Sequence, residues 1–429
     1  MRFCGNARGI FFIKCLSFAA RGVTIYEISG EKMEYVFSDR MKNMGGNAIR
    51  EIFKLLSRPD MISFAGGFPT ASLLPCGEVG KIASDLMNSD RAKEILQYGA
   101  TEGYAPLRRR IAAFVSRYGI EGAGEENVRI VSGGQQTIDL MCKCFVNDGD
   151  VVLVEDPTYL ASLHILRTYR GKAVGVRSGE DGLDLDDLEQ KIKAFKPKML
   201  YCVPTFSNPT GRTYSLAVRK AIAELTAKYG VMVLEDDPYS EIRFCGERVP
   251  SIKSFDKCGN VVFTASFSKT ISPGLRVGYC VGDPAVMAKL TIGKQAVDVH
   301  TSMLSQAIVE EYFARGLFDK VLSRSIPVYK EKKDAMHAAI ERYMPEEFSS
   351  TDPFGGLFIW GGFAEKSGID TACAFAGACE RGVAYVSGET FFADGKDRRH
   401  LRLNYSAASP EQIERGIKIL ADYFKELIK

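Results

Sequence analysis

The stretch Ser266-Phe-Ser-Lys-Thr-Ile-Ser-Pro-Gly-Leu-Arg-Val-Gly-Tyr279 is the most informative part of this 429-residue chain. It places one lysine, Lys269, shortly after Ser266 and Ser268 and puts Arg276 just beyond a Pro-Gly turn. A lysine that forms a Schiff base needs an amine with a lowered pKa, and a bound phosphate needs hydroxyls and a guanidinium. The segment therefore predicts a Schiff-base lysine beside a phosphate site. The alternative is a strand, Val261 to Ala265, that ends in a polar turn with an ordinary surface lysine.

Size and composition are those of a globular protein that we expect to hold two domains. The chain is 46% hydrophobic and 25% charged, with a net charge of +3. This balance gives no reason to expect nucleic acid or a membrane as partner. The eleven cysteines form no CxxC pair and the four histidines are far apart, so we expect no metal site. Scattered cysteines fit the reduced thiols of a cytoplasmic protein.

Residues 1–43 are interpreted as an N-terminal extension. The apolar run Gly9 to Ala20 is interrupted by a lysine and is too short to span a bilayer. Its flanking residues give it a weak similarity to a signal peptide. Our preferred hypothesis is that Met33 is the natural start and that Ser29 to Lys32 is a ribosome-binding sequence translated by mistake. Residues 1–32 would then be absent from the native protein.

From about residue 105 short apolar strands alternate with amphipathic helices. The expected strands are Val128–Val131, Val151–Val154, Met199–Val203, Val231–Leu234 and Val261–Ala265. Such strands separated by helices predict a mainly parallel sheet that is covered on both faces. A long helical stretch from Pro284 to about Arg342 then leads to a C-terminal α+β piece. The polar motifs follow the strands, which is where open α/β sheets bind their ligands.

The segment Ser132-Gly-Gly-Gln-Gln136 joins one strand to the start of a helix. Backbone N–H groups are free at a helix start and the helix dipole is positive there, which suits a phosphate group. Glycine also lets the backbone approach closely. The alternative is a plain glycine turn.

Together these segments resemble those of the pyridoxal-phosphate (PLP) aminotransferases of fold type I, class I/II, and especially the 2-aminoadipate/kynurenine branch. From about Met44 onward the chain is similar to the 2-aminoadipate aminotransferases and their bacterial relatives. The shared segments are Ala48-Ile-Arg-Glu-Ile, Ser63-Phe-Ala-Gly-Gly, Tyr98-Gly-Ala-Thr-Glu-Gly-Tyr-Ala-Pro-Leu, Ser266-Phe-Ser-Lys and Ser272-Pro-Gly-Leu-Arg. The resemblance implies PLP as cofactor. It also implies a large domain over residues 78–315 with a mainly parallel seven-stranded sheet, and a smaller α+β domain formed by 44–77 and 316–429.

The resemblance also assigns the residues that would hold the phosphate of PLP. Gly134 and Gln135 would do so from the helix start. Ser266, Ser268 and Arg276 would complete the clamp. Gly134 stands where this branch usually has serine, which removes a hydroxyl contact but leaves the backbone N–H. We therefore expect weaker retention of PLP.

Around the ring of PLP, the resemblance gives Tyr159 a stacking role. Asn208 would donate a hydrogen bond to the phenolic oxygen of PLP, which Tyr239 would also reach. The Asp-x-x-Tyr spacing selects Asp236 to face the pyridine nitrogen and keep it protonated. Asp237 is then interpreted as a supporting or surface residue. Taken singly, these residues also fit a rim tyrosine, an Asn-Pro turn and an acidic loop.

For the substrate, Lys269 would carry the Schiff base and, once displaced, move a proton between Cα and C4′. Arg402, in a C-terminal strand, would bind the α-carboxylate through its bidentate guanidinium, with Gly67 beside it. Arg50, on a predicted helix over Ala48–Leu56, stands where an arginine of the 2-aminoadipate aminotransferases binds the distal carboxylate. The alternative for Arg402 is one more strand arginine in a basic neighbourhood.

Tyr98 is the residue from which we predict the oligomeric state. In the relatives, the tyrosine at this place reaches the phosphate of the neighbouring subunit. Carried over, this implies a homodimer with a shared active site. The alternative is a glycine-rich loop whose tyrosines pack on the core.

The predicted function is transfer of an amino group from an L-amino acid to a 2-oxo acid such as 2-oxoglutarate. Candidate donors are 2-aminoadipate, aromatic amino acids and branched or long apolar amino acids. A PLP-binding transcription regulator has an effector domain similar to this family but needs an N-terminal winged helix, and residues 1–43 carry no such pattern. A PLP lyase or decarboxylase on the same fold stays open, because the lysine motif does not exclude it.

Overall fold

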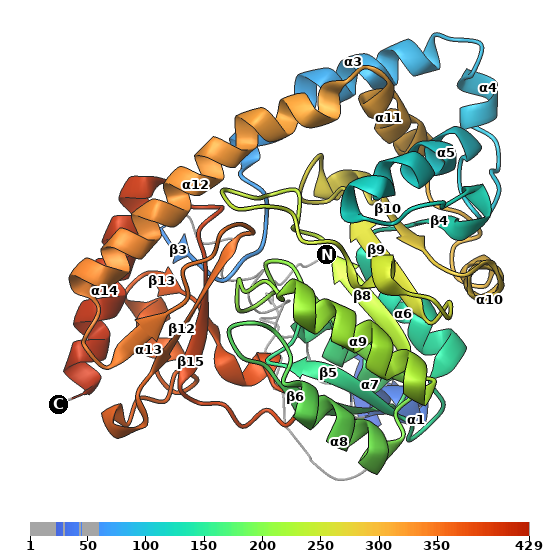
Figure 1. The fold of residues 1–429 in the computed structure, drawn as a ribbon. Coiled ribbons are helices and arrows are strands. Elements are labelled where there is room, and N and C mark those ends of the chain that lie inside the picture. Colours follow the sequence, from blue (N-terminus) through green and yellow to red (C-terminus); the bar gives the residue numbers. More distant parts are fainter. Residues whose placement is uncertain (1–22, 29–30, 43, 45–59, 429) are drawn as a thin grey trace, which may run out of the picture. The chain divides into compact units, whose positions relative to one another are not determined.

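A computed structural model of the chain describes residues 23–28, 31–42, 44 and 60–428, which belong to two units, Met1–Gly45 and Gly46–Lys429 (Figure 1). In the first unit, β1 (Val23–Ile28) pairs antiparallel with β2 (Glu31–Val36), and the short helix α1 (Asp39–Lys42) follows. The predicted helix over residues 48–56, and with it Arg50, lies outside the described residues. The hypothesis that residues 1–32 are not native stays a prediction.

A seven-stranded sheet forms the centre of the second unit, in the order β4-β10-β9-β8-β7-β5-β6. Its strands are β4 (Val128–Val131), β5 (Val151–Asp156), β6 (Lys172–Arg177), β7 (Met199–Cys202), β8 (Met232–Asp237), β9 (Val261–Ser266) and β10 (Gly278–Val281). All neighbouring pairs from β9 to β6 are parallel, and only β10 runs antiparallel to its two neighbours. The mainly parallel seven-stranded sheet is therefore confirmed.

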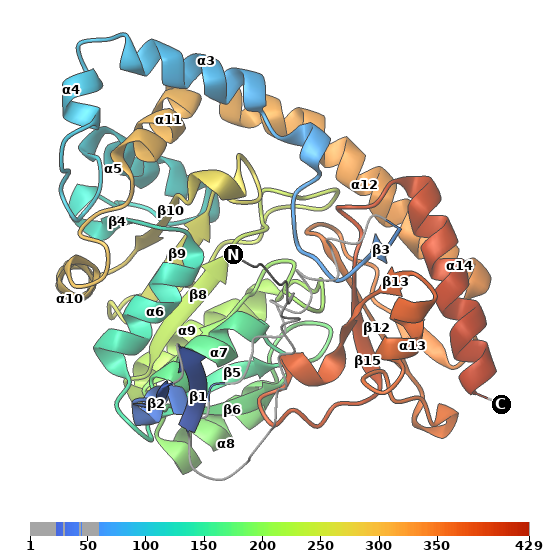
Figure 2. The same cartoon turned by 180° about the vertical axis from the view of Figure 1, so that it is seen from behind.

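Helices cover both faces of this sheet, which explains why its strands are continuous apolar runs (Figures 1 and 2). Against one face lie α6 (Gly134–Phe145), α7 (Leu160–Thr168) and α10 (Pro284–Gln295). Against the other lie α8 (Leu185–Phe195) and α9 (Leu216–Tyr229). The side chains of β5, β7 and β8 alternate between these two cores: Val154 and Leu234 contribute to the first, and Leu153 and Val233 to the second.

A third core surrounds the β4–β10 end of the sheet. It contains residues of α3 (Cys76–Met87), α5 (Ala105–Phe114), α11 (Met303–Ala314) and the first turns of α12 (Leu317–Tyr343). The short helix α4 (Ala92–Ile95) adds Ile95 to it. The helical stretch predicted from Pro284 to about Arg342 is divided into three helices, α10, α11 and α12.

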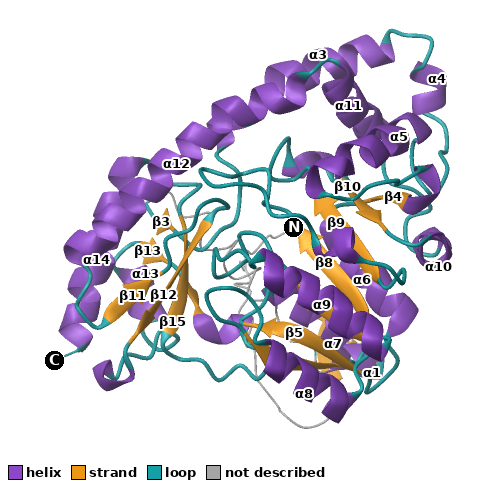
Figure 3. Cartoon of the chain, in the orientation of Figure 1, coloured by secondary structure: helices purple, strands orange, loops and turns teal. Residues whose placement is uncertain are grey.

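A smaller, antiparallel sheet follows, in the order β11-β12-β15-β14 (Figure 3). Its strands are β11 (Phe348–Ser350), β12 (Phe358–Phe363), β14 (Val386–Ser387) and β15 (His400–Asn404). The two-residue strands β3 (Ile62–Ser63) and β13 (Val383–Ala384) pair in parallel beside it. The core of this part also contains residues of α13 (Phe375–Glu380), α14 (Pro410–Leu427) and the later turns of α12. The predicted domain division stays a proposal: residues 78–315 form the large domain, and residues 44–77 and 316–429 together form the small domain.

The carboxyl ends of β5, β7, β8 and β9 come together at one edge of the large sheet, where ligand sites of open α/β sheets lie. The loops and helix starts that follow these strands carry Tyr159, Asn208, Tyr239 and Lys269. No helix in the described part of the chain has the length and apolar character needed to cross a membrane.

Candidate active site

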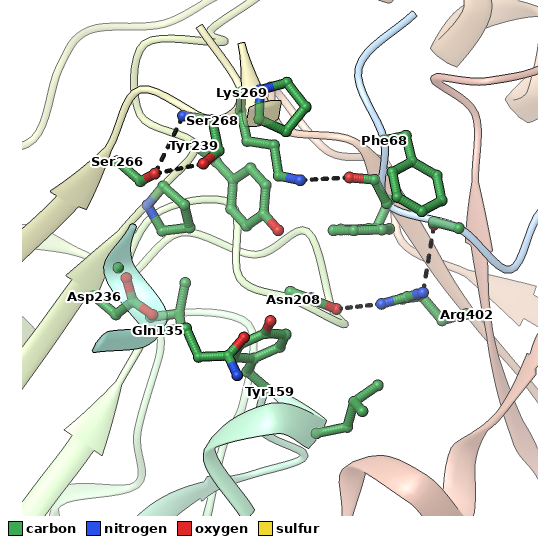
Figure 4. A pocket seen from close by; sticks show the side chains of 18 of the residues that line it. Phe68, Gln135, Tyr159, Asn208, Asp236, Tyr239, Ser266, Ser268, Lys269 and Arg402 are labelled. Atoms are coloured by element: carbon green, nitrogen blue, oxygen red, sulfur yellow. Dashed lines mark hydrogen bonds between the residues drawn. The ribbon is translucent and has the colours of Figure 1, made fainter. Parts of the chain in front are cut away.

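A cavity of about 300 Å³ opens at this edge of the sheet (Figure 4). Most of the predicted site residues line it: Gly67, Gly134, Gln135, Tyr159, Asn208, Asp236, Tyr239, Ser266, Ser268, Lys269, Arg276 and Arg402. These residues come from segments up to 335 positions apart (402 − 67) in the sequence. Two predicted residues are not among them. Arg50 lies outside the described residues, and Tyr98 is 82% exposed and does not line the cavity.

The start of α6 forms one end of the cavity. Gly133 caps the helix with φ 87° and ψ 158°, a conformation that glycine adopts readily and other residues do not. A Cβ at Gly133 would lie 2.4 Å from a terminal nitrogen of Arg276, so the guanidinium packs directly on this glycine. At Gly134, by contrast, a Cβ would meet nothing closer than 3.7 Å.

Arg276 and two serines continue this end of the cavity. Arg276 donates a 2.9 Å hydrogen bond to the carbonyl oxygen of Ser132 and a longer one, 3.5 Å, to the hydroxyl of Ser268. The hydroxyl of Ser266 in turn donates to that of Ser268 at 2.8 Å. A guanidinium, two hydroxyls and the free N–H groups of a helix start thus lie together, which is the set of donors that a phosphate monoester requires.

Asp236 lies at the end of β8 and lines the cavity. Its Oδ2 accepts a 2.8 Å hydrogen bond from the hydroxyl of Tyr201. Burial raises the pKa of Asp236 to about 7, although the hydrogen bond from Tyr201 opposes this shift. Asp237 is the next residue of the strand, where side chains alternate between faces. It is only 7% exposed and accepts a hydrogen bond from the N–H of Ser240, so of the two predicted positions for Asp237 the supporting one fits and the surface one is wrong.

Lys269 lies between the phosphate-type end of the cavity and Arg402. Its Nζ donates a 2.6 Å hydrogen bond to the carbonyl oxygen of Gly67 (Figure 4). Burial, together with the nearby cations Arg402 and Arg276, lowers the pKa of Lys269 to about 8. An amine with this pKa has a substantial uncharged fraction near neutral pH, as a nucleophilic lysine requires.

Arg402 closes the other end of the cavity and is 4% exposed. One terminal nitrogen donates to Oδ1 of Asn208 at 2.8 Å, and the other donates to the carbonyl oxygen of Ala65 at 2.6 Å. Its guanidinium stacks on the ring of Phe358, 4.3 Å from the centroid. No described residue hydrogen-bonds to its Nε, which is buried. A buried guanidinium without a carboxylate partner is a strong site for a small anion.

Tyr239 and Tyr159 lie on the wall between the two ends. Asn208, which accepts the hydrogen bond from Arg402, lines this wall together with Tyr239. Burial raises the pKa of Tyr159 to about 12, which keeps its ring a neutral phenol.

The cavity therefore fits PLP by the chemistry of its donors. It offers a set of phosphate ligands at the start of α6, an amine of lowered pKa at Lys269, and the buried carboxylate of Asp236. A further cation, Arg402, lies apart from these groups and is left for the substrate.

Sequence reasoning missed three residues of this site. Tyr201 was interpreted only as part of an apolar strand, although a tyrosine hydroxyl inside a buried strand is a signal for a polar partner. Gly133 was included in the phosphate motif without a role, although the Gly-Gly pair is a signal for a positive φ. Phe358 lies under Arg402 because β12 pairs with β15, and a single apolar residue in the sequence gives no signal for that contact.

Comparison with known proteins agrees with this geometry. The model of the family described as "Aminotransferase class I and II" matches residues 59–420. The chain is 39% identical to the aromatic-amino-acid aminotransferase 1 of Thermococcus litoralis, over 92% of this chain and 95% of that protein. It is 38% identical to the 2-aminoadipate transaminase of Thermus thermophilus, over 89% and 94%. The solved structure of the Pyrococcus horikoshii kynurenine aminotransferase in complex with PMP superimposes with a TM-score of 0.87 at 37% identity, covering 92% of this chain and 98% of that one.

Proposed function

This chain belongs to the class I and II aminotransferase family and is a PLP-dependent aminotransferase of fold type I, and on that premise we propose its substrates and the roles of its residues. Its substrates are an amino acid and an oxo acid. The donors we propose are aromatic and long or branched apolar L-amino acids, with 2-aminoadipate as a further donor. The acceptor we propose is 2-oxoglutarate.

One observation carries the proposal. The cavity holds three cations, Lys269, Arg276 and Arg402, at separate places, together with the carboxylate of Asp236. Each of these groups meets a different requirement of PLP or of an α-amino acid. When bound, PLP supplies an aldehyde that reacts with amines and a ring that withdraws electrons from Cα of the substrate.

The residues around the cavity divide this work. Gly134, Gln135, Ser266, Ser268 and Arg276 would hold the phosphate. Tyr159 would cover the ring, Asn208 and Tyr239 would donate to its phenolic oxygen, and Asp236 would keep its nitrogen protonated.

Arg402 would bind the α-carboxylate, and Gly67 lies beside it. The two terminal nitrogens of Arg402 are held by Asn208 and Ala65, so the guanidinium has a fixed orientation before substrate arrives. With the carboxylate fixed there, we propose that the amine of Lys269 takes the proton from Cα. Its lowered pKa keeps part of the amine uncharged at neutral pH, as a general base must be.

The lining of the cavity argues for apolar and aromatic side chains. Among the described lining residues, the three cations already have roles with the cofactor or the α-carboxylate. The wall next to them includes the apolar residues Phe68, Leu160 and Phe358. A distal carboxylate would need a cation from elsewhere, and Arg50 is our candidate. Relatives named for aromatic amino acids, kynurenine and 2-aminoadipate fit a site that accepts both kinds of donor.

A screen of half-reactions tests this substrate class. The PLP-loaded enzyme is mixed with single L-amino acids, and the conversion of bound PLP is followed by absorbance. We expect phenylalanine, leucine and 2-aminoadipate to convert the cofactor and 2-oxoglutarate to reverse the change. Arg50→Ala should selectively impair 2-aminoadipate. If none of the three donors converts the bound PLP, the proposed function is contradicted. If Arg50→Ala slows conversion equally for all three donors, Arg50 does not bind the distal carboxylate.

We further propose a homodimer in which Tyr98 contributes to the site of the neighbouring subunit. Leu96, Tyr98, Val297 and Val299 expose between 47% and 82% of their surface, and the ring of Tyr98 contacts His300 edge to face. Two segments thus present apolar side chains side by side, which a second copy would bury. We also place the enzyme in the cytoplasm, which the free cysteines of the described part of the chain support.

A further inference from the structure

Tyr201 and Asp236 form a buried pair at the base of the cavity. Tyr201 is 1% exposed and Asp236 is 6% exposed, and the phenol O–H donates to Oδ2 of the carboxylate at 2.8 Å. A hydrogen bond from a buried donor to an ionised acceptor is among the stronger interactions of this kind.

The register of the sheet explains why these two side chains meet. In the parallel pair of β7 and β8, Tyr201 lies opposite Leu234. Asp236 is two residues beyond Leu234, so its side chain lies on the same face of the sheet. The hydroxyl of Tyr201 therefore reaches the carboxylate of Asp236 from the neighbouring strand β7. The side of the carboxylate that faces the cavity stays open.

The two carboxylate oxygens of Asp236 have different surroundings. Oδ2 is occupied by Tyr201, whereas no residue in the described part of the chain donates a hydrogen bond to Oδ1. A Cβ built on Gly134 would lie 3.7 Å from Oδ1, so this oxygen faces the start of α6. Oδ1 is thus the oxygen available to a ring nitrogen in the cavity.

We propose that Tyr201 is a positioning residue of the aminotransferase reaction: its hydroxyl fixes the carboxylate of Asp236 with Oδ1 toward the cofactor nitrogen and keeps it ionised. This inference rests on the proposed role of Asp236. Tyr201 itself touches neither the substrate nor the reacting atoms. It acts through the proton that Asp236 and the ring nitrogen share.

The direction of the effect follows from electrostatics. Burial raises the pKa of Asp236, and the hydrogen bond from Tyr201 lowers it. Without the hydroxyl the carboxyl becomes a stronger base, so the shared proton moves from the ring nitrogen toward Asp236. A ring with less positive charge withdraws electrons less well, and removal of the Cα proton slows.

Tyr201→Phe tests this in the PLP-loaded enzyme, because it removes one oxygen and keeps the packing of the ring. The readout is the ¹⁵N chemical shift of ring-labelled PLP as a function of pH. We expect the ¹⁵N shift near neutral pH to move toward the value of an unprotonated ring, because the loss of one charge-assisted hydrogen bond changes the ratio of the two proton positions about tenfold. We also expect kcat to fall about tenfold with KM for the amino donor within about twofold, because Arg402 is unaffected.

Tyr214→Phe is the matched control. Tyr214 is 2% exposed and donates its O–H to the buried carboxylate of Glu155 at 2.5 Å, and neither residue lines the cavity. This variant also loses a buried phenol–carboxylate bond, so we expect a comparable drop in melting temperature but an unchanged ¹⁵N shift and kcat.

Asp236→Asn separates failure of this inference from failure of the proposed function. If Asp236→Asn shifts the ¹⁵N signal and Tyr201→Phe does not, Tyr201 has no positioning role and the inference is overturned. If Asp236→Asn also leaves the signal unchanged, the proposed role of Asp236 fails as well. A shift in Tyr201→Phe of the same size as in Tyr214→Phe would likewise overturn the inference.

Discussion

The amine of Lys269 donates a 2.6 Å hydrogen bond to the carbonyl oxygen of Gly67. Two residues earlier, the carbonyl oxygen of Ala65 accepts a hydrogen bond of the same length from Arg402. The cation that we assign to the cofactor and the cation that we assign to the substrate are therefore held by one short backbone segment. Both lie in one cavity, and the positive charge of Arg402 helps to lower the pKa of Lys269.

This proximity predicts the pH dependence of cofactor uptake. Only the uncharged amine of Lys269 attacks an aldehyde, and burial with Arg402 and Arg276 lowers its pKa to about 8. The rate at which cofactor-free protein binds PLP covalently should thus rise with pH and level off above about 8. Stopped-flow absorbance measures this rate. Arg402→Met removes a nearby positive charge and should move the midpoint upward, and a midpoint near that of an exposed lysine would contradict the predicted environment.

The two glycines at the start of α6 should respond differently to substitution. At Gly133 a side chain meets both a glycine-type conformation and the guanidinium of Arg276. A side chain at Gly133 would distort the helix start and displace Arg276, so we expect Gly133→Ala to lose about 1–3 kcal/mol of PLP binding, which is about 5- to 150-fold.

Gly134→Ala is the matched control, because a Cβ at Gly134 meets no atom closer than 3.7 Å. Gly134→Ala should bind PLP within about twofold of the native enzyme. Gly134→Ser should bind it more tightly, because a hydroxyl is added to the phosphate site. Equilibrium dialysis measures the dissociation constant of PLP for Gly133→Ala, Gly134→Ala and Gly134→Ser. Equal weakening in Gly133→Ala and Gly134→Ala would contradict the assigned geometry.

The guanidinium of Arg402 should determine the affinity for the amino donor. Arg402→Lys keeps the charge but loses the planar pair of donors that Asn208 and Ala65 orient. We expect kcat/KM for phenylalanine to fall about 100-fold, mainly through KM, which steady-state kinetics will show. Arg398→Lys, at an exposed arginine that pairs with Glu389, is the control and should leave kcat/KM unchanged. A normal KM in Arg402→Lys would show that the α-carboxylate binds elsewhere.

The dimer proposal predicts complementation between inactive chains. Tyr98→Ala impairs the neighbouring site and Lys269→Ala abolishes its own site. A heterodimer of the two, purified through two different tags, has one site with both residues intact. It should have about half of the native activity per dimer, because symmetric dimers of this kind contain two sites. Activity no higher than that of the two separate variants would exclude a shared site.

Much of the fold and of the site was predictable because the signals are local. The apolar strands are read directly from the sequence, since a parallel sheet buried on both faces needs continuous apolar runs. Lys269, Asn208 and Asp236 each follow such a strand, and the strand ends meet at one edge. The period of a strand also separates Asp236 from Asp237, because neighbouring side chains point to opposite faces.

The remaining features depend on contacts between distant segments. Tyr201 meets Asp236 only because β7 and β8 pair with Tyr201 opposite Leu234, a register that the sequence does not state. The orientation of the Arg402 guanidinium depends on its contacts with Ala65 and Phe358, which lie far from it in the chain. The break in the predicted helical stretch near Gly316 is instead local, because Gly316 has a φ of 64° just past the end of α11, where glycine commonly ends a helix.

The most direct test of the central claim is the absorption spectrum of Lys269→Ala after loading with PLP. Lys191→Ala is the control, because Lys191 also donates a 2.6 Å hydrogen bond to a backbone carbonyl, that of Gly175, and does not line the cavity. We predict that Lys269→Ala lacks the visible band of lysine-bound PLP and loses at least about 100-fold in turnover, whereas Lys191→Ala keeps both. A visible band and turnover in Lys269→Ala equal to those of Lys191→Ala would contradict the assignment of Lys269.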